Sequence, residues 1–182
     1  LILGCGTNIL FTDNFNGVIL KNEMKGLEIT DEDDRYIQIR VASGEKWDDF
    51  VKYCVEKGYY GIENLSFIPG SVGAATVQNI GAYGVEVKNF ILEVEGIFLN
   101  EKKEMVLRNM DCKFDYRDSI FKRELKGKFF ITSVLFRLSK KRNFNLDYID
   151  LQKEIQKFQE INLINIREAI RRIRNSKLPD TS

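Results

Sequence analysis

Two glycine-rich segments of this sequence have the composition of backbone that binds an anion. The first comprises residues 4–8, directly after an apolar stretch, and the second comprises residues 68–84. Glycine has no Cβ to keep a ligand away and allows positive φ, so successive amide N–H groups can converge on a diphosphate without any lysine. The alternative is that these glycines form tight turns or let strands pack closely, above all in the short pattern at Gly4 and Gly6.

A third segment, residues 115–119, places Tyr116 and Arg117 between two aspartates just before an apolar stretch. An arginine there could hold a carboxylate through two parallel hydrogen bonds, or stabilise an oxyanion as it forms. The residues alone favour a simpler alternative, in which Arg117 forms a surface ion pair with Asp115 or Asp118.

Near the C-terminus, Arg174 and Lys177 belong to a cluster of cations at the end of an expected helix. The helix dipole stabilises cations at that end, so a solvated face explains them, although they could equally contact the phosphates of a ligand. Tyr148 belongs to no sequence pattern that by itself indicates a function.

The elements that must position these segments mix strands and helices without regular alternation, which favours an α+β fold. Strands are expected at residues 1–3, 18–20, 36–42, 92–99, 104–107 and 129–138. Apolar residues at helical spacing predict a helix over residues 47–57, closed by Gly58. Residues 61–84 suggest irregular chain, and a capping box at Asn165 and Glu168 predicts where the last helix begins.

The composition argues against several classes of function. The 28 basic and 27 acidic residues nearly cancel, which removes the electrostatic argument for binding nucleic acid or a membrane surface. No apolar run approaches the roughly 20 residues needed to span a bilayer. Because the chain has no histidine, Ser-His-Asp and Cys-His centres are excluded within it. The three cysteines suit neither a disulfide framework nor a zinc site, so we expect reduced thiols and no metal.

Taken together, these segments resemble the UDP-N-acetylenolpyruvoylglucosamine reductases. The matching phrases are Leu-Gly-Cys-Gly-Thr-Asn at residues 3–8, Glu-Asn-Leu-Ser-Phe-Ile-Pro-Gly-Ser-Val-Gly-Ala-Ala at 63–75, Gln-Asn-Ile-Gly-Ala-Tyr-Gly-Val-Glu at 78–86, Tyr-Arg-Asp-Ser-Ile-Phe-Lys at 116–122 and Ser-Lys-Leu-Pro-Asp at 176–180. They occur in the family's order and span nearly the whole chain. The phrase over residues 68–84 and Tyr-Arg-Asp-Ser are specific, whereas the first glycine phrase alone is not.

The resemblance implies an FAD-binding domain of the vanillyl-alcohol oxidase type, in which two α/β pieces clamp the flavin. We expect that domain over residues 1–140, with its opening strands missing before Leu1. Residues 141–182 would then lead into a substrate-binding domain. The resemblance also implies a cytoplasmic monomer that acts on a small molecule and binds neither nucleic acid nor a membrane.

Enzymes of this family use NADPH to reduce bound FAD, and then reduce the enolpyruvyl ether of UDP-N-acetylglucosamine to UDP-N-acetylmuramate. That step serves peptidoglycan synthesis, and hence cell wall biogenesis, cell shape and cell division. By position, Arg117 resembles the catalytic arginine that stabilises negative charge on the enolpyruvyl group, whereas Tyr116, Tyr148 and Lys177 resemble substrate contacts. Tyr148 also suggests the branch whose mobile loop closes a tyrosine over the UDP-sugar. The residues that the resemblance assigns to FAD are Gly4, Gly6, Thr7, Asn8, Ile68, Pro69, Gly70, Ser71, Gly73, Ala74, Ala75, Gln78, Asn79, Gly81, Ala82, Tyr83, Gly84 and Arg174.

The sequence also departs from the family pattern. Thr7 replaces the usual serine, Asp115 stands where glycine commonly precedes Tyr-Arg, and Thr76 stands where proline is usual. The family's proton-donating serine and its catalytic glutamate would lie beyond Ser182, so we expect this chain to be inactive alone. Two rival hypotheses stay open: another FAD-dependent oxidoreductase of the same fold, and a flavin-binding remnant without catalysis.

Overall fold

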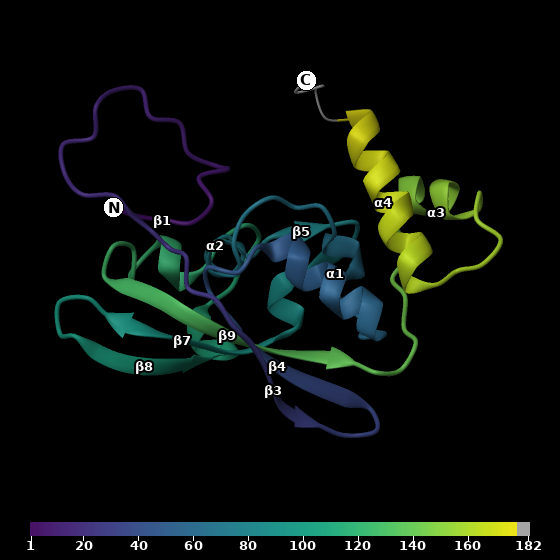
Figure 1. Cartoon of the computed structure of the whole chain (residues 1–182), viewed down its shortest axis with the longest axis horizontal. Coiled ribbons are helices and arrows are strands. Elements are labelled where there is room, and N and C mark those ends of the chain that lie inside the picture. The colour runs from purple at the N-terminus through teal and green to yellow at the C-terminus, as the bar shows by residue number, and fades with distance from the viewer. Residues whose placement is uncertain (178–182) are drawn as a thin grey trace.

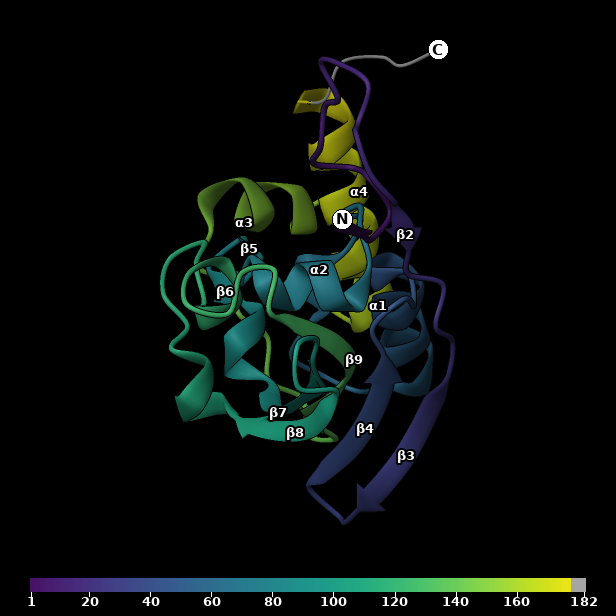
Figure 2. The same ribbon diagram turned by 90° about the vertical axis from the view of Figure 1, so that its left-hand side faces the viewer.

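The computed structural model describes residues 1–177, and its centre is a five-stranded antiparallel sheet. In spatial order the strands are β3 (Leu27–Glu32), β4 (Tyr36–Ala42), β9 (Phe129–Ser139), β7 (Ile91–Phe98) and β8 (Lys103–Arg108). Figure 1 shows helices α1 (Trp47–Lys57) and α2 (Val72–Val77) lying over one face of this sheet. In Figure 2 the β3–β4 hairpin projects away from the helices. The expected α+β fold is confirmed.

Strand β4 shows why the sheet has one buried face. Ile37, Ile39 and Val41 are fully buried, whereas the polar residues between them point to the other face, as the period of two in the sequence predicts. On that opposite face Arg40 pairs with Glu95 of β7 at 2.8 Å. The apolar side of the sheet therefore lies against the helices and forms the main core.

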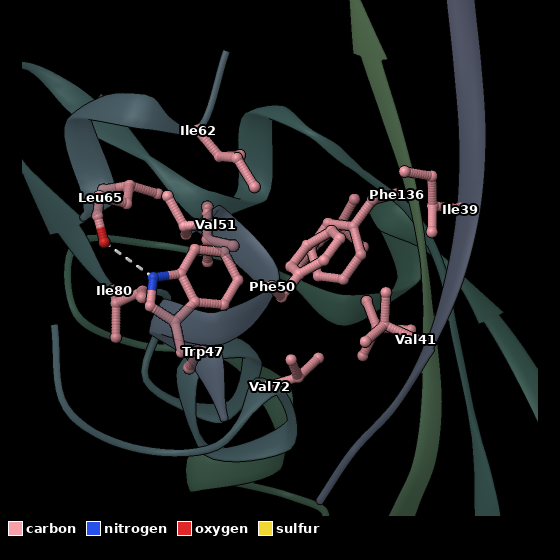
Figure 3. Packing of buried hydrophobic residues seen from close by; sticks show 14 of the residues in the cluster. Ile39, Val41, Trp47, Phe50, Val51, Ile62, Leu65, Val72, Ile80 and Phe136 are labelled. Carbon is pink, nitrogen blue, oxygen red and sulfur yellow. Dashed lines mark hydrogen bonds between the residues drawn. The ribbon is translucent and has the colours of Figure 1, made fainter. Parts of the chain in front are cut away.

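Helix α1 supplies the other half of that core. Trp47, Phe50 and Val51 are buried, and the Trp47 and Phe50 rings contact the ring of Phe136 of β9 (Figure 3). Gly58 ends the helix with φ at +76°, where its N–H reaches the last carbonyl groups. The prediction of this helix from its apolar spacing is confirmed.

The N-terminal residues form a small separate sheet that supports a long loop. Strand β1 (Ile2–Leu3) pairs in parallel with β2 (Leu20–Lys21), and the chain between them extends away from the sheet at one end of the molecule (Figure 1). The first glycine segment begins where β1 ends. It therefore starts the loop.

The second glycine segment is more regular than the sequence suggests. Residues 61–84 contain η1 (Glu63–Leu65), α2 and β5 (Gly81–Ala82), which pairs with β6 (Val85–Glu86) ahead of η2 (Val87–Asn89). The expectation of irregular chain is wrong for α2 because Ser71 caps the helix, its Oγ accepting the Ala74 N–H at 3.4 Å.

Two further helices form a second hydrophobic cluster beyond α1. After η3 (Asn109–Cys112), η4 (Ile120–Lys122) and β9, the chain forms α3 (Ile149–Ile155) and α4 (Leu163–Lys177). Their cluster consists of Leu151, Ile155, Ile166, Ala169, Ile170 and Ile173. The predicted capping box at Asn165 is wrong: the helix begins earlier, where the Asn162 side chain accepts the Asn165 N–H at 2.8 Å. No helix among the described residues is long and apolar enough to cross a membrane.

Candidate functional site

The two glycine segments, about 60 residues apart in sequence, meet around one open pocket of about 300 Å³. Its wall also contains Arg117, which comes from a third part of the chain. The lining residues are Leu3, Gly4, Cys5, Gly6, Thr7, Asn8, Ile9, Ile68, Pro69, Gly70, Ala74, Ala75, Gln78, Ile80 and Arg117. We call this cavity the cradle pocket. Its wall is mostly backbone and small side chains, which leaves amide groups accessible to a ligand.

The segments meet closely because Gly4 has no side chain. A Cβ on Gly4 would lie 2.7 Å from the Ser71 Oγ and 3.4 Å from the Cβ of Ala74, too close for a larger residue without movement. Gly6 has φ at +73°, a conformation that favours glycine. Within the part of the chain that the structure describes, the amide N–H groups of residues 4–8 have no backbone acceptor. These successive donors at the pocket wall fit an anionic group such as a diphosphate.

A second, more apolar cavity of about 510 Å³ lies on the other side of the Gly4 contact. It shares Gly4, Ile9, Ala74 and Gln78 with the cradle pocket, and Ser71 and Gly73 belong to its wall. Gly73 also packs tightly, since a Cβ there would lie 2.8 Å from the Cβ of Ser43. At Gly73, therefore, glycine allows the chain to pack closely, whether or not this residue also contacts a ligand.

Arg117 stands at the tip of a tight turn. The backbones of Asp115 and Asp118 bond to each other in both directions, at 3.0 and 3.1 Å, and Arg117 has φ at +54°. Its guanidinium donates to the carbonyl of Gly81. The surface ion pair is not formed, because the carboxylate of Asp115 accepts the Tyr116 N–H at 2.7 Å and that of Asp118 pairs with Arg123 at 3.2 Å. The guanidinium thus remains at the pocket.

Asn79 holds this turn against the second glycine segment. Its Nδ2 donates to the Asp115 carbonyl at 2.7 Å, and its Oδ1 accepts the Lys88 N–H at 3.1 Å. The side chain is fully buried and does not line the pocket. Since Ser119 also donates to the Val77 carbonyl at 2.7 Å, both ends of the turn are fixed. The position of Arg117 therefore depends on residues behind the pocket wall.

The other predicted residues form a second group beside α4. The rings of Tyr83 and Tyr148 are 5.2 Å apart, and the Lys177 Nζ lies 6.0 Å from the centre of the Tyr148 ring. Burial raises the pKa of Tyr83, and the nearby Arg174 guanidinium opposes that rise. Lys177 pairs with Asp150 at 2.5 Å, which raises the pKa of the lysine and lowers that of the carboxyl group. This group is rich in cations and aromatic rings.

Some predicted cofactor residues thus lie away from both cavities. They are Asn79, Gly81, Ala82, Tyr83, Gly84 and Arg174. Tyr116 also lies outside, 78% exposed on the turn beside Arg117. The pocket wall adds Leu3, Cys5, Ile9 and Ile80, which the sequence reasoning missed. Their place within or directly beside the two glycine segments was the signal that could have identified them.

The comparisons with known proteins agree with this arrangement. A family model described as an FAD binding domain matches residues 1–101, which is more than half of the chain. The chain is 49% identical over 180 residues to the UDP-N-acetylenolpyruvoylglucosamine reductase of Bacteroides fragilis, and 44% identical over 180 residues to that of Bdellovibrio bacteriovorus. These matches cover 99% and 98% of this chain, and 54% of each relative. The chain thus spans about half the length of the curated relatives it matches.

A solved structure shares the fold. The crystal structure of UDP-N-acetylenolpyruvylglucosamine reductase (MurB) from Thermus caldophilus aligns with 99% of this chain and 57% of its own, at a TM-score of 0.67 and 20% identity. At that identity the likeness concerns the fold alone. Together with the family model and the curated relatives, it confirms the predicted resemblance. The chain belongs to the FAD binding domain family, as a relative of the UDP-N-acetylenolpyruvoylglucosamine reductases.

Proposed function

We propose that the complete protein containing this chain uses NADPH and bound FAD to reduce UDP-N-acetylglucosamine enolpyruvate to UDP-N-acetylmuramate. The observation that carries the proposal is the cradle pocket, where two glycine segments and Arg117 meet from distant parts of the sequence. The reaction is the one after which the relatives are named, as UDP-N-acetylenolpyruvoylglucosamine reductases. The role of this chain is to bind the cofactor and to orient groups around it.

The glycine segments would hold the FAD diphosphate. The amide groups of residues 4–8 fit this role, because they lack backbone acceptors among the described residues and lie at the pocket wall. Ile68, Pro69 and Gly70 form the facing part of the wall. The hydride transfer itself is the chemistry that FAD supplies when bound.

Arg117 would stabilise negative charge on the enolpyruvyl group. Its guanidinium lies at the pocket wall and, among residues 1–177, donates to one carbonyl, that of Gly81. Its other N–H groups are therefore open to a carboxylate. The fixed turn supports this role, since a donor that is held in place before the reaction needs little reorganisation during it. Tyr116 beside it would contact the substrate from the exposed side.

Tyr148 and Lys177 would bind the UDP-sugar. Both lie outside the cradle pocket in a group that also contains Arg174, so cations and an aromatic ring are available to phosphates and to a base. Arg174, whose guanidinium lies beside Tyr83 in this group, would contact the flavin. The substrate-binding part would begin near residue 141, which the separate hydrophobic cluster of α3 and α4 supports.

The setting of the reaction follows from its chemistry. UDP-N-acetylmuramate is a precursor of peptidoglycan, so the protein would act in cell wall biogenesis and affect cell shape and cell division. We further propose that it is a cytoplasmic monomer. The nearly balanced charge of the chain gives no sign of a nucleic-acid or membrane partner.

The test is a two-step flavin experiment on the product of the complete gene. Purified protein should be yellow, NADPH should bleach it without oxygen, and the enolpyruvyl substrate should then restore the colour faster than oxygen does. Restoration by oxygen alone would favour another oxidoreductase of the same fold. Protein that binds flavin but is not bleached by NADPH would indicate a binding remnant.

A further inference from the structure

The first turn of α1 holds one side of the cradle pocket at three points. The Trp47 indole donates to the Leu65 carbonyl at 2.9 Å, and its backbone N–H donates to the Gly70 carbonyl at 3.0 Å. Between them, the Phe67 N–H donates to the Asp48 carboxylate at 2.6 Å. The strip of pocket wall at residues 68–70 is therefore fixed at both ends by two neighbouring helix residues.

Arg167 of α4 binds the same carboxylate from the other side. Its two terminal nitrogens donate to the two oxygens of Asp48 at 2.6 and 2.7 Å, and its guanidinium lies 4.2 Å from the centre of the Phe67 ring. The Arg167 side chain is 13% exposed and that of Asp48 29%, so water screens this pair less than the other ion pairs of α4. Arg167 thus contacts both Asp48 and Phe67, the residue whose N–H group Asp48 binds.

The backbone at Phe67 requires such support. Its φ is +59°, which is unfavourable for a residue with a bulky side chain and persists only where surrounding contacts hold it. Those contacts are the Asp48 carboxylate on the N–H and the Arg167 guanidinium on the ring. The strained residue immediately precedes the pocket wall, so a change at either contact alters the direction in which residues 68–70 leave it.

We infer that the Asp48–Arg167 ion pair is a positioning element that sets the shape of the cradle wall and couples that wall to α4. The inference rests on the proposed binding of FAD in the cradle pocket. Its consequence is a link between two sites, since Arg174 follows Arg167 by about two turns on the same helix. Asp48 and Arg167 contact neither ligand. They would then determine how the pocket wall at residues 68–70 is oriented relative to the group beside α4 that is proposed to bind the UDP-sugar.

The test compares flavin affinity with thermal stability in the complete protein. FAD is titrated into apoprotein, with the dissociation constant taken from flavin fluorescence well below the melting temperature of each variant. We expect Arg167→Gln to weaken FAD binding about tenfold, as a broken coupling between neighbouring elements can. Arg167→Lys keeps the charge but loses the bidentate geometry, so it should recover part of the affinity. Asp48→Asn keeps an acceptor for Phe67 but loses the ion pair, so its affinity should also fall.

Arg40→Gln is the matched control. It removes another partly buried arginine–carboxylate pair, Arg40 with Glu95 (side chains 34% and 25% exposed), on the sheet face opposite the core. We expect it to lower the melting temperature while leaving the dissociation constant for FAD unchanged. A role in folding alone would give the same result for Arg167→Gln.

The outcomes separate the inference from the proposed function. Wild-type protein that binds no FAD would overturn both. Wild-type protein that binds FAD, with Arg167→Gln less stable but equal in affinity, would overturn the positioning role alone. If Arg167→Gln does not fold, Arg167→Lys and Asp48→Asn decide: wild-type affinity in both would overturn the inference.

Discussion

The ring of Tyr83 meets the ring of Tyr148 edge to face, with centres 5.2 Å apart and planes at 86°. Tyr83 belongs to the turn that ends the second glycine segment, and Tyr148 precedes α3, so the contact joins two segments 65 residues apart. Edge-to-face pairs of this kind stabilise a contact beyond the area that they bury. The Tyr148 ring is thereby held over Lys177, in the group proposed to bind the UDP-sugar.

This contact predicts different effects for two substitutions of Tyr148. Tyr148→Phe keeps the ring pair and removes only the hydroxyl, so the KM for the UDP-sugar should rise about threefold to tenfold, as for one lost hydrogen bond. Tyr148→Ala removes the ring as well and should raise it further. Because Tyr148 is 42% exposed, Tyr148→Phe should leave the melting temperature nearly unchanged, and Tyr148→Ala should lower it slightly through the lost ring pair. Steady-state kinetics with the complete protein measures this, and unchanged KM values in both variants would make Tyr148 an ordinary surface residue.

Arg117 predicts a separation of the two half-reactions. Arg117→Ala should slow the oxidation of reduced flavin by the enolpyruvyl substrate about 100-fold or more, the usual loss when an oxyanion donor is removed. Reduction by NADPH should change much less, since no enolpyruvyl charge develops there. Stopped-flow absorbance follows each half-reaction by itself. Lys122, whose ammonium donates to the Arg117 carbonyl at 2.7 Å, provides a control, because Lys122→Met loosens the turn without removing the guanidinium. Equal losses in both half-reactions would contradict the role of Arg117.

Much of the fold follows from local patterns in the sequence. Strand β4 and helix α1 were predictable because their apolar residues repeat with periods of two and 3.6, and Gly58 marks the end of the helix. The short helix α2 was not, since its small residues carry no amphipathic pattern and its cap at Ser71 is visible only in three dimensions. The start of α4 was predicted at Asn165, but Asn162 lies three residues earlier and can also cap a helix. Leu163 is buried, so the helix begins at the earlier asparagine.

The site divides in a similar way. The glycine segments were predictable as backbone that approaches a ligand, but their meeting around one pocket depends on the contact of Gly4 with Ser71, which no local pattern contains. The sequence left open whether Arg117 pairs with a neighbouring aspartate. The structure answers this because the carboxylates of Asp115 and Asp118 bind other donors, the Tyr116 N–H and Arg123. The contribution of Asp48 and Arg167 was not predictable either, because they lie 119 residues apart.

Gly6 and Gly58 allow the strain of a substitution to be separated from its effect on the cradle. They have φ of +73° and +76°, and a Cβ would meet nothing closer than 3.9 Å at Gly6 and nothing within 4 Å at Gly58. Alanine at either position should therefore cost a similar amount, about 1 kcal/mol of unfolding free energy. Only Gly6→Ala should also weaken FAD binding, because only Gly6 lines the cradle pocket. Flavin titration and urea unfolding of both variants measure this, and equal FAD affinities would remove Gly6 from the cradle.

Glu63 predicts a pH dependence of stability. It is 2% exposed, its carboxylate accepts the Gly61 N–H at 2.5 Å, and burial raises its pKa above the usual 4.5. As the pH rises through 4.5, the unfolded chain releases this proton before the folded chain does. The folded state then binds more protons than the unfolded state, so the contribution of Glu63 to stability falls with rising pH until the raised pKa is passed.

Glu63→Gln should remove that loss. The amide has the shape of the protonated acid, keeps an oxygen for Gly61 and carries no charge, so the variant should match wild type below pH 4.5 and exceed it above. A gain of about 1–2 kcal/mol is expected near neutral pH, which corresponds to about 2–8 °C in melting temperature for a protein of this size. Melting curves of both proteins between about pH 4 and pH 8 measure the difference. Parallel curves would mean that the folded and unfolded states bind the Glu63 proton equally, and a lower melting temperature for the variant at neutral pH would mean that the charged carboxylate is favoured in the fold.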